Sequence, residues 1–175
     1  MKRWLILFTV GCVAFAGVAN AAVQQGDTEI DVLGSWFTQN GEEGIPDLDV
    51  LFVSARLGYF ISDNIQVAGV GLGAWTDLFG TDVDIYAIGA SAKYHFMPTN
   101  QMVPYIGGQI LWGDIDTDAG DDDATLWGPV AGLRYELNAY NDFFVEYQYH
   151  VWDGDISDIL DGGHAVFIGL IHQFK

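Results

Sequence analysis

Apolar and polar side chains alternate with a period of two along most of the chain. In residues 82–96, one face carries large apolar side chains such as Tyr86 and Ile88, while the other carries Ser91, Lys93 and His95. Successive side chains of a β-strand point to opposite faces of the sheet, so this alternation predicts strands rather than helices. Similar runs recur to the end of the sequence without a linker. We therefore predict one all-β domain over residues 22–175.

Two kinds of connection separate the predicted strands. Acidic connections cover residues 40–47, 77–82, 114–124 and 153–163, and compact polar turns cover residues 62–64, 98–101 and 138–141. They alternate strictly, so seven connections give eight strands with both termini on the side of the short turns. Short turns at one end and longer acidic connections at the other are the layout of an outer-membrane barrel. The sequence thus predicts an eight-stranded antiparallel up-and-down transmembrane β-barrel with acidic extracellular loops.

The few cations of this domain indicate which face lies inside. Apart from Lys175 they are Arg56, Lys93 and Arg134, each on the polar face of its strand and in the half nearer a short turn. The same face and half also carry four acidic residues: Glu29, Asp31, Glu136 and Glu146. A charge at bilayer depth is tolerated when it faces inward and is paired. We predict that these seven residues form an interior ion-pair network, which argues against the apolar cavity of a secreted lipocalin-like binder.

Aromatic residues are expected to form two belts at the membrane interfaces, where amphipathic rings settle. The belt near the short turns would contain Tyr59, Tyr94, Phe96, Tyr135, Phe143 and Phe174. The belt near the acidic connections would contain Trp36, Trp75, Tyr86, Trp127 and Trp152. In residues 103–112 both faces hold apolar side chains, and Gln109 is placed inward because lipid would penalise it.

The N-terminus has the composition of an export signal. Lys2 and Arg3 precede an apolar stretch over residues 4–18, and residues 19–21 form a small-x-small cleavage site. This is the layout of a cleaved secretory signal peptide, which we place at residues 1–21. The only cysteine, Cys12, lies within it, so the mature chain is expected to have no thiol and no cysteine-based metal site. The formal net charge of −18 excludes a nucleic-acid partner, which requires Lys and Arg.

Several segments together resemble the small outer-membrane β-barrel proteins of the OmpA/OmpX type. They are GYFISDN at 58–64, VPYIG at 103–107 and AGLRY at 131–135. The last strand resembles the assembly signal of that family, with Gly169, His172 and Phe174 in the matching places. Two departures are that Lys175 follows Phe174 and that His172 replaces an aromatic residue. We expect no counterpart of the peptidoglycan-binding domain that the larger relatives carry.

The resemblance implies a monomer in the bacterial outer membrane that contacts membrane lipids and lipopolysaccharide. Periplasmic chaperones and the outer-membrane assembly machinery would be its partners during biogenesis. An eight-stranded barrel is just wide enough for side chains to fill it. We therefore expect a plugged interior and a structural, surface-interaction or envelope-stability role. The alternative is a narrow or gated, porin-like channel for small solutes.

Neither an enzyme nor a tightly bound cofactor is expected. The His-x-Ser pattern of barrel deacylases is missing after each histidine. The acidic stretch 114–123 does not fit a calcium-binding EF-hand loop that starts at Asp114. Position six of such a loop is glycine and position twelve is glutamate, and these places hold Ala119 and Thr125. The favoured interpretation is a solvated acidic loop that keeps the surface soluble. Loosely bound Ca²⁺ or Mg²⁺, shared with lipopolysaccharide phosphates, is the alternative.

Overall fold

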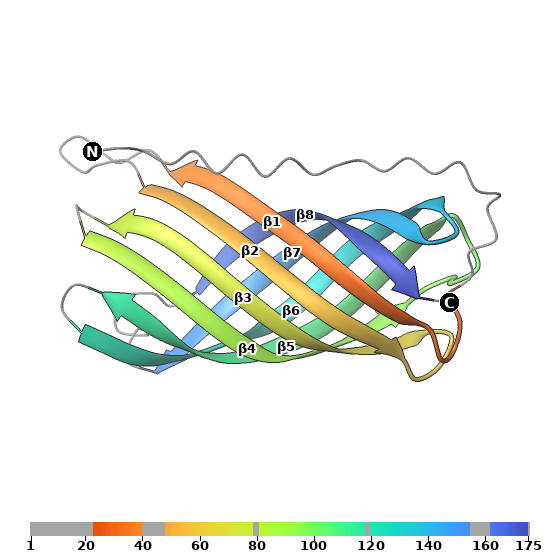
Figure 1. Ribbon diagram of the computed structural model, residues 1–175, viewed down its shortest axis with the longest axis horizontal. Coiled ribbons are helices and arrows are strands. Elements are labelled where there is room, and N and C mark those ends of the chain that lie inside the picture. The colour runs from red at the N-terminus through yellow and green to blue at the C-terminus, as the bar shows by residue number, and fades with distance from the viewer. Residues whose placement is uncertain (1–22, 40–47, 79–80, 118–119, 155–161, 175) are drawn as a thin grey trace.

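Eight antiparallel strands close into one barrel in the computed structural model (Figure 1). The structure describes residues 23–39, 48–78, 81–117, 120–154 and 162–174. The strands are β1 (Thr28–Gln39), β2 (Leu48–Phe60), β3 (Ile65–Leu78), β4 (Thr81–His95), β5 (Met102–Thr117), β6 (Gly120–Asn138), β7 (Asn141–Gly154) and β8 (Gly162–Phe174). Each strand pairs with its sequence neighbours, which confirms the predicted up-and-down topology. The described part of the chain holds no helix of the length and apolarity needed to cross a membrane.

Strand β1 closes the barrel against β8. The paired residues run from Thr28 opposite Phe174 to Gly34 opposite Ile168. The start of β1 and the end of β8 therefore lie at the same end as the turns between β2 and β3, β4 and β5, and β6 and β7. We call this the short-turn end and the opposite one the loop end. In Figure 1 the short-turn end is on the right, where the label C stands.

One predicted connection is wrong in its extent. Residues 114–124 were expected to form a loop, but β5 and β6 stay paired up to Thr117 opposite Gly120. Pairing between antiparallel backbones does not require apolar side chains, so a hairpin can continue past the apolar band of its strands. The connection at residues 77–82 is likewise mostly strand, with Leu78 opposite Thr81. The predicted signal peptide, the connection at residues 40–47 and most of that at 153–163 lie outside the described residues.

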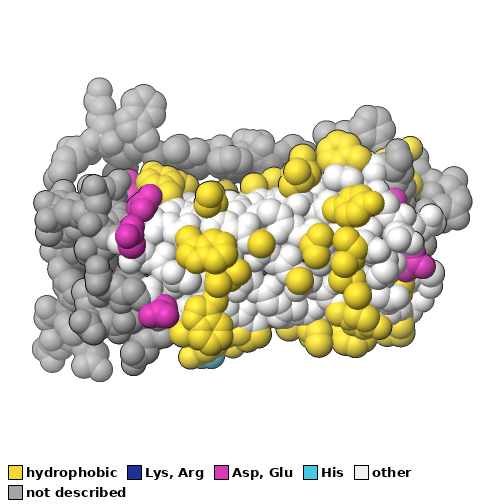
Figure 2. All heavy atoms as spheres, turned by 90° about the horizontal axis from the view of Figure 1, so that it is seen from below, with side chains coloured by type: hydrophobic (Ala, Val, Ile, Leu, Met, Phe, Trp, Pro, Cys, Tyr) yellow, Lys and Arg dark blue, Asp and Glu magenta, His cyan; other side chains and the backbone are white. Residues whose placement is uncertain are grey.

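The outer face of the barrel is apolar. Ile88, in the middle of β4, has 74% of its surface exposed, and Leu57 on β2 has 58%. Figure 2 shows apolar side chains gathered in two groups along the barrel, one towards each end. Tyr59 and Tyr94 belong to the exposed aromatic side chains near the short turns, and Trp127 to those near the loops. The side chains of Trp36 and Trp152 lie outside the described part.

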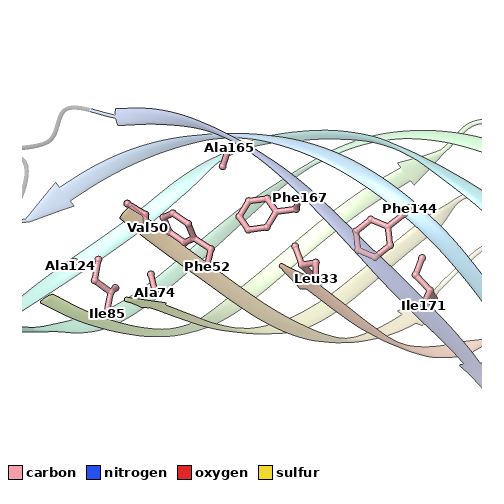
Figure 3. Packing of buried hydrophobic residues seen from close by; sticks show 10 residues of the cluster. All are labelled: Leu33, Val50, Phe52, Ala74, Ile85, Ala124, Phe144, Ala165, Phe167 and Ile171. Carbon is pink, nitrogen blue, oxygen red and sulfur yellow. The ribbon is translucent and has the colours of Figure 1, made fainter. Parts of the chain in front are cut away.

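The interior has two layers of different character. Towards the loop end, buried apolar side chains such as Phe52 and Phe167 fill the barrel, and Phe144 and Ile171 extend this cluster towards the other end (Figure 3). Towards the short-turn end, the buried side chains are mostly charged or polar. Membrane barrels commonly have a polar interior, whereas the loop half of this barrel is filled largely by apolar side chains.

Candidate functional site

The register of the strands brings charged side chains from five of them into the short-turn half of the barrel. Asp31 on β1 lies directly opposite Arg56 on β2. Glu146 on β7 lies opposite Gly132 on β6, and Lys93 on β4 lies opposite Gly107 on β5. All four charged side chains point inward and are at least 95% buried. Small residues beside Glu146 and Lys93 leave room for these long side chains inside a narrow barrel.

Glu146 is the acceptor at the centre of the first group. Both oxygens of its carboxylate accept from Arg56, with Nη2 to Oε1 at 2.6 Å and Nη1 to Oε2 at 2.9 Å. The Lys93 ammonium lies 2.9 Å from Oε2. The Tyr105 hydroxyl donates to Oε2 at 2.8 Å, and the Gln148 amide donates to Oε1 at 2.6 Å. One carboxylate thus joins β2, β4, β5 and β7 across the barrel.

Asp31 lies at the edge of this first group. Its Oδ2 is 4.0 Å from Arg56 Nη1 and 3.8 Å from Lys93 Nζ. These separations exceed those of a hydrogen bond. Asp31 therefore attracts the two cations electrostatically but does not fix their positions by hydrogen bonds. The group therefore contains two cations and two carboxylates and is electrically balanced.

Arg134 on β6 is the centre of a second group. Its Nη2 lies 2.9 Å from Glu29 Oε2, and its Nε donates to Asp142 Oδ2 at 2.5 Å. Two amides also donate hydrogen bonds to these carboxylates. Gln66 donates to Glu29, and Gln173 donates to Asp142 Oδ2 at 2.9 Å. This group links β1, β3, β6, β7 and β8 closer to the short-turn end.

Aromatic rings pack against the three buried cations. The Lys93 ammonium lies 4.8 Å from the centre of the Tyr105 ring, and Arg56 lies 5.8 Å from that of Phe144. Arg134 lies 5.9 Å from the centre of the Phe60 ring. Such contacts favour a cation that has been removed from water. The rings thus stabilise the buried cations, and that of Phe144 also belongs to the apolar cluster.

Gly132 has a steric role at the first group. A β-carbon there would collide with the phenol of Tyr105, which reaches over this glycine to Glu146. Only a residue without a side chain fits between the β6 backbone and that phenol.

Six of the seven charged residues singled out from the sequence take part in these ion pairs: Glu29, Asp31, Arg56, Lys93, Arg134 and Glu146. The seventh, Glu136, is buried on the same face of β6 and lies opposite Asp142 in the register. Asp142 is the charged residue that sequence reasoning missed. It follows a short turn directly, but it has the same parity as Glu146 on its strand, and that parity could have identified it. Gln109 also points inward and donates to Gln148 at 2.8 Å.

The three residues of the expected assembly signal lie on both faces of β8. His172 and Phe174 point outward, and their rings form an edge-to-face pair with centres 5.0 Å apart. At Gly169 an added β-carbon would collide with the carbonyl oxygen of Val32 on β1 and would lie 2.6 Å from the ring of Phe144. The small size of Gly169 is therefore required for interior packing, whatever its part in assembly.

No group of three or more His, Cys, Asp or Glu side chains with the geometry of a metal site occurs within the described residues. Most side chains of the acidic stretch 114–123, where loosely bound Ca²⁺ or Mg²⁺ was the alternative to a solvated loop, lie outside them. The described interior is a filled core whose charges are held by many short contacts. Such an arrangement supports the barrel wall more readily than it binds a substrate.

Comparison with known proteins places this barrel among outer-membrane proteins. The crystal structure of Neisserial surface protein A superposes with a TM-score of 0.61 at 18% identity, covering 85% of this chain and 96% of the other. The N-terminal β-barrel domain of OprF from Pseudomonas aeruginosa gives a TM-score of 0.57 at 20% identity, covering 86% and 98%. OprG from Pseudomonas aeruginosa gives 0.55 at 14% identity, covering 87% and 98%.

At these identities the similarity establishes the fold alone. No sequence among the curated proteins matches the chain. The family model described as "Outer membrane protein beta-barrel domain" matches residues 8–171, which is nearly the whole chain. The chain therefore belongs to the outer membrane protein beta-barrel domain family.

Proposed function

We propose that this chain is an integral protein of the bacterial outer membrane whose closed barrel has a structural, surface-interaction or envelope-stability role. The observation that carries the proposal is the filled interior. A charged layer spans the barrel at the short-turn half, and an apolar layer spans it at the loop half. A conducting path would have to cross both layers.

Each layer opposes conduction for a different physical reason. Opening the charged layer would separate Glu146 from Arg56 and Lys93, and a buried charge that loses its partner is strongly destabilised. The apolar layer disfavours water because rings such as those of Phe52 and Phe167 offer it no hydrogen bonds. The alternative function, a narrow or gated channel for small solutes, requires both layers to rearrange together.

Membrane insertion is tested by extraction and electrophoresis of the full-length protein expressed in a Gram-negative host. We expect detergent to be necessary for its extraction and the unheated protein to migrate differently from the boiled one. A protein that is fully soluble without detergent would refute the membrane assignment. The mass of the boiled protein also shows whether the N-terminal segment is removed, because the mature protein would begin near residue 22.

Conduction is tested separately by recording from the purified protein in planar bilayers. The filled interior predicts a flat current at moderate voltages. Discrete, repeated openings would instead favour the channel and would require the interior layers to move.

The outer surface supports lipid as the principal partner. All three cations of the described residues, Arg56, Lys93 and Arg134, are buried, so none of them can bind lipopolysaccharide phosphates. Contact between these phosphates and the acidic connections would therefore require shared divalent cations. We extend the proposal to a monomer that is delivered by periplasmic chaperones and the assembly machinery. The absence of enzymatic activity stays a prediction.

A further inference from the structure

The outer wall of the barrel carries an ionisable side chain near the loop end. His164 is the third residue of β8, and its side chain is exposed on the same face as those of Val166 and Ile168. The lysine and arginine side chains of the described residues are all buried. Exposed histidines are therefore the side chains of this described wall that can become positively charged. An ionisable residue on a membrane-embedded surface is costly and usually has a function.

Two tyrosines of β7 hold the His164 ring. Tyr149 lies directly opposite His164 in the register, and their ring centres are 4.9 Å apart. The Tyr147 ring stacks on that of His164 at 5.8 Å, and its hydroxyl lies 2.5 Å from Nδ1. Nε2 is thus left without a hydrogen-bond partner among the described residues. A Tyr147 hydroxyl that donates to Nδ1 places the ring hydrogen on Nε2, which then faces the membrane as a donor.

The strand that contains His164 has an open edge at this position. β1 and β8 stay paired only up to Gly34 opposite Ile168. Beyond that point, within the described register, residues 35–39 of β1 pair only with β2 and residues 162–167 of β8 pair only with β7. The backbone N–H and C=O groups along such edges lack the partners that a sheet supplies. In a membrane these groups require other polar partners, so the β8 edge offers backbone donors beside the imidazole.

His172 on the same strand provides a contrast. It is exposed as well, and its Nδ1 lies 2.9 Å from Asn141 Oδ1. Both neighbouring strands are paired at this position, with Ile30 on one side and Asn141 on the other. His172 therefore shares the ring chemistry of His164, but it has no open strand edge beside it.

A phosphate is the part of a membrane lipid that fits these donors. Its charged oxygens accept several strong hydrogen bonds, both from side chains and from backbone N–H groups. The loop end of an outer-membrane barrel faces the exterior, so the lipid would belong to the outer leaflet. Val166 and Ile168 follow His164 towards mid-barrel and are exposed, so they offer an apolar surface to the acyl chains of the same lipid.

We propose that His164 binds the phosphate of an outer-leaflet lipid at the open edge between β1 and β8. Nε2 and the backbone N–H groups of the β8 edge donate to the phosphate, and Tyr147 orients the imidazole. This assignment rests on the membrane function proposed above, because a soluble barrel would meet no lipid there.

The experiment uses the full-length protein, labelled with ¹⁵N-histidine and refolded in dodecyl maltoside micelles. Phosphatidic acid is added as the probe. Diacylglycerol with the same acyl chains is the control without phosphate, and sodium phosphate tests for a site that takes free phosphate. Native mass spectrometry measures the fraction of protein that retains lipid, and the imidazole ¹⁵N signals show whether His164 contacts it. The variants are His164→Phe and Tyr147→Phe, with His172→Phe as the matched control.

We expect phosphatidic acid to shift the Nε2 signal of His164 saturably, with little effect of diacylglycerol or sodium phosphate. His164→Phe keeps an aromatic ring but loses a hydrogen bond to a charged group, so it should bind phosphatidic acid about tenfold more weakly. His172→Phe should bind like the wild type. Tyr147→Phe should move the Nδ1 signal of His164 and weaken binding by a smaller factor, which covers the case that His164→Phe fails to fold.

Three results would overturn the lipid-phosphate site. They are equal retention of phosphatidic acid by His164→Phe and the wild type, equal retention of diacylglycerol, and saturation by sodium phosphate at the same concentration. A heat-dependent gel shift of the same samples separates this site from the membrane function. A shifted barrel that retains no phosphatidic acid overturns the site alone, whereas a protein that is soluble without detergent overturns both.

Discussion

Replacing Glu146 with glutamine removes the negative charge that Arg56 and Lys93 share while keeping a side chain of the same size. Removing one partner of a buried ion pair costs about 3–5 kcal/mol because the other charge stays buried. Here one carboxylate serves two cations at 2.6 Å and 2.9 Å, which favours the upper part of that range. Asp31 remains 3.8–4.0 Å from both cations and offsets part of the loss. We expect the free energy of unfolding to fall by about 4 kcal/mol.

The measurement is urea unfolding of the barrel in lipid vesicles, under conditions where unfolding and refolding curves coincide. Asp31→Asn is the matched control, because it removes one buried carboxylate from the same group without breaking a hydrogen bond given by Arg56 or Lys93. Its cost should be less than half that of Glu146→Gln. If Asp31→Asn lowers the free energy of unfolding as much as Glu146→Gln does, the short contacts of Glu146 do not determine how much a buried carboxylate contributes to stability. A Glu146→Gln variant within 1 kcal/mol of the wild type would show that the ion pairs add little to stability.

Three further substitutions test the two faces of the barrel. Ile88→Lys should lower the free energy of unfolding in vesicles by about 2–4 kcal/mol, since it places a charge on the lipid face at mid-barrel; an unaffected variant would contradict the lipid-facing assignment, with Ile88→Leu as control. Gly169→Ala should cost about 1–3 kcal/mol through collision with the Val32 carbonyl oxygen and the Phe144 ring, and Phe144→Leu should recover only the part that is due to the ring in urea titrations. The double variant Phe52→Ala, Phe167→Ala should still give a flat current in planar bilayers, because the charged layer around Glu146 stays closed; discrete openings would show that the apolar layer alone is the seal.

The strands and the direction of most side chains could be predicted because both depend on local alternation. The alternation within each strand shows which residues share a face, so Arg56, Lys93 and Arg134 could be assigned to the interior before any strand pairing was known. The choice of partners could not be predicted. Arg56 pairs with Glu146, 90 residues away, because the stagger of the closed barrel brings β2 and β7 to the same height. No local pattern encodes that stagger.

The apolar layer escaped prediction for a different reason. Phe52 has the same parity as Arg56 on β2, and Phe167 has the same parity as Gly169 on β8. Alternation identifies a face, but it does not show that the character of this face changes along the strand. Asp142 was missed because it begins its strand, where a polar residue is also expected of a turn. The interior parity of each whole strand, followed from one end to the other, would have identified both.

The ion pairs connect strands that are far apart in the sequence, and this has a consequence for the lifetime of the folded protein. Neighbouring hairpins can form early, because their contacts are local in sequence. The sheet must curve almost into a closed barrel before Glu146 can contact Arg56 and Lys93, or Arg134 can contact Glu29. We therefore expect these contacts to form after the rate-limiting step of folding. Interactions absent from the transition state slow unfolding and leave the folding rate nearly unchanged. The charged interior would thus make the inserted barrel persist kinetically, long after the proteins that delivered it have left.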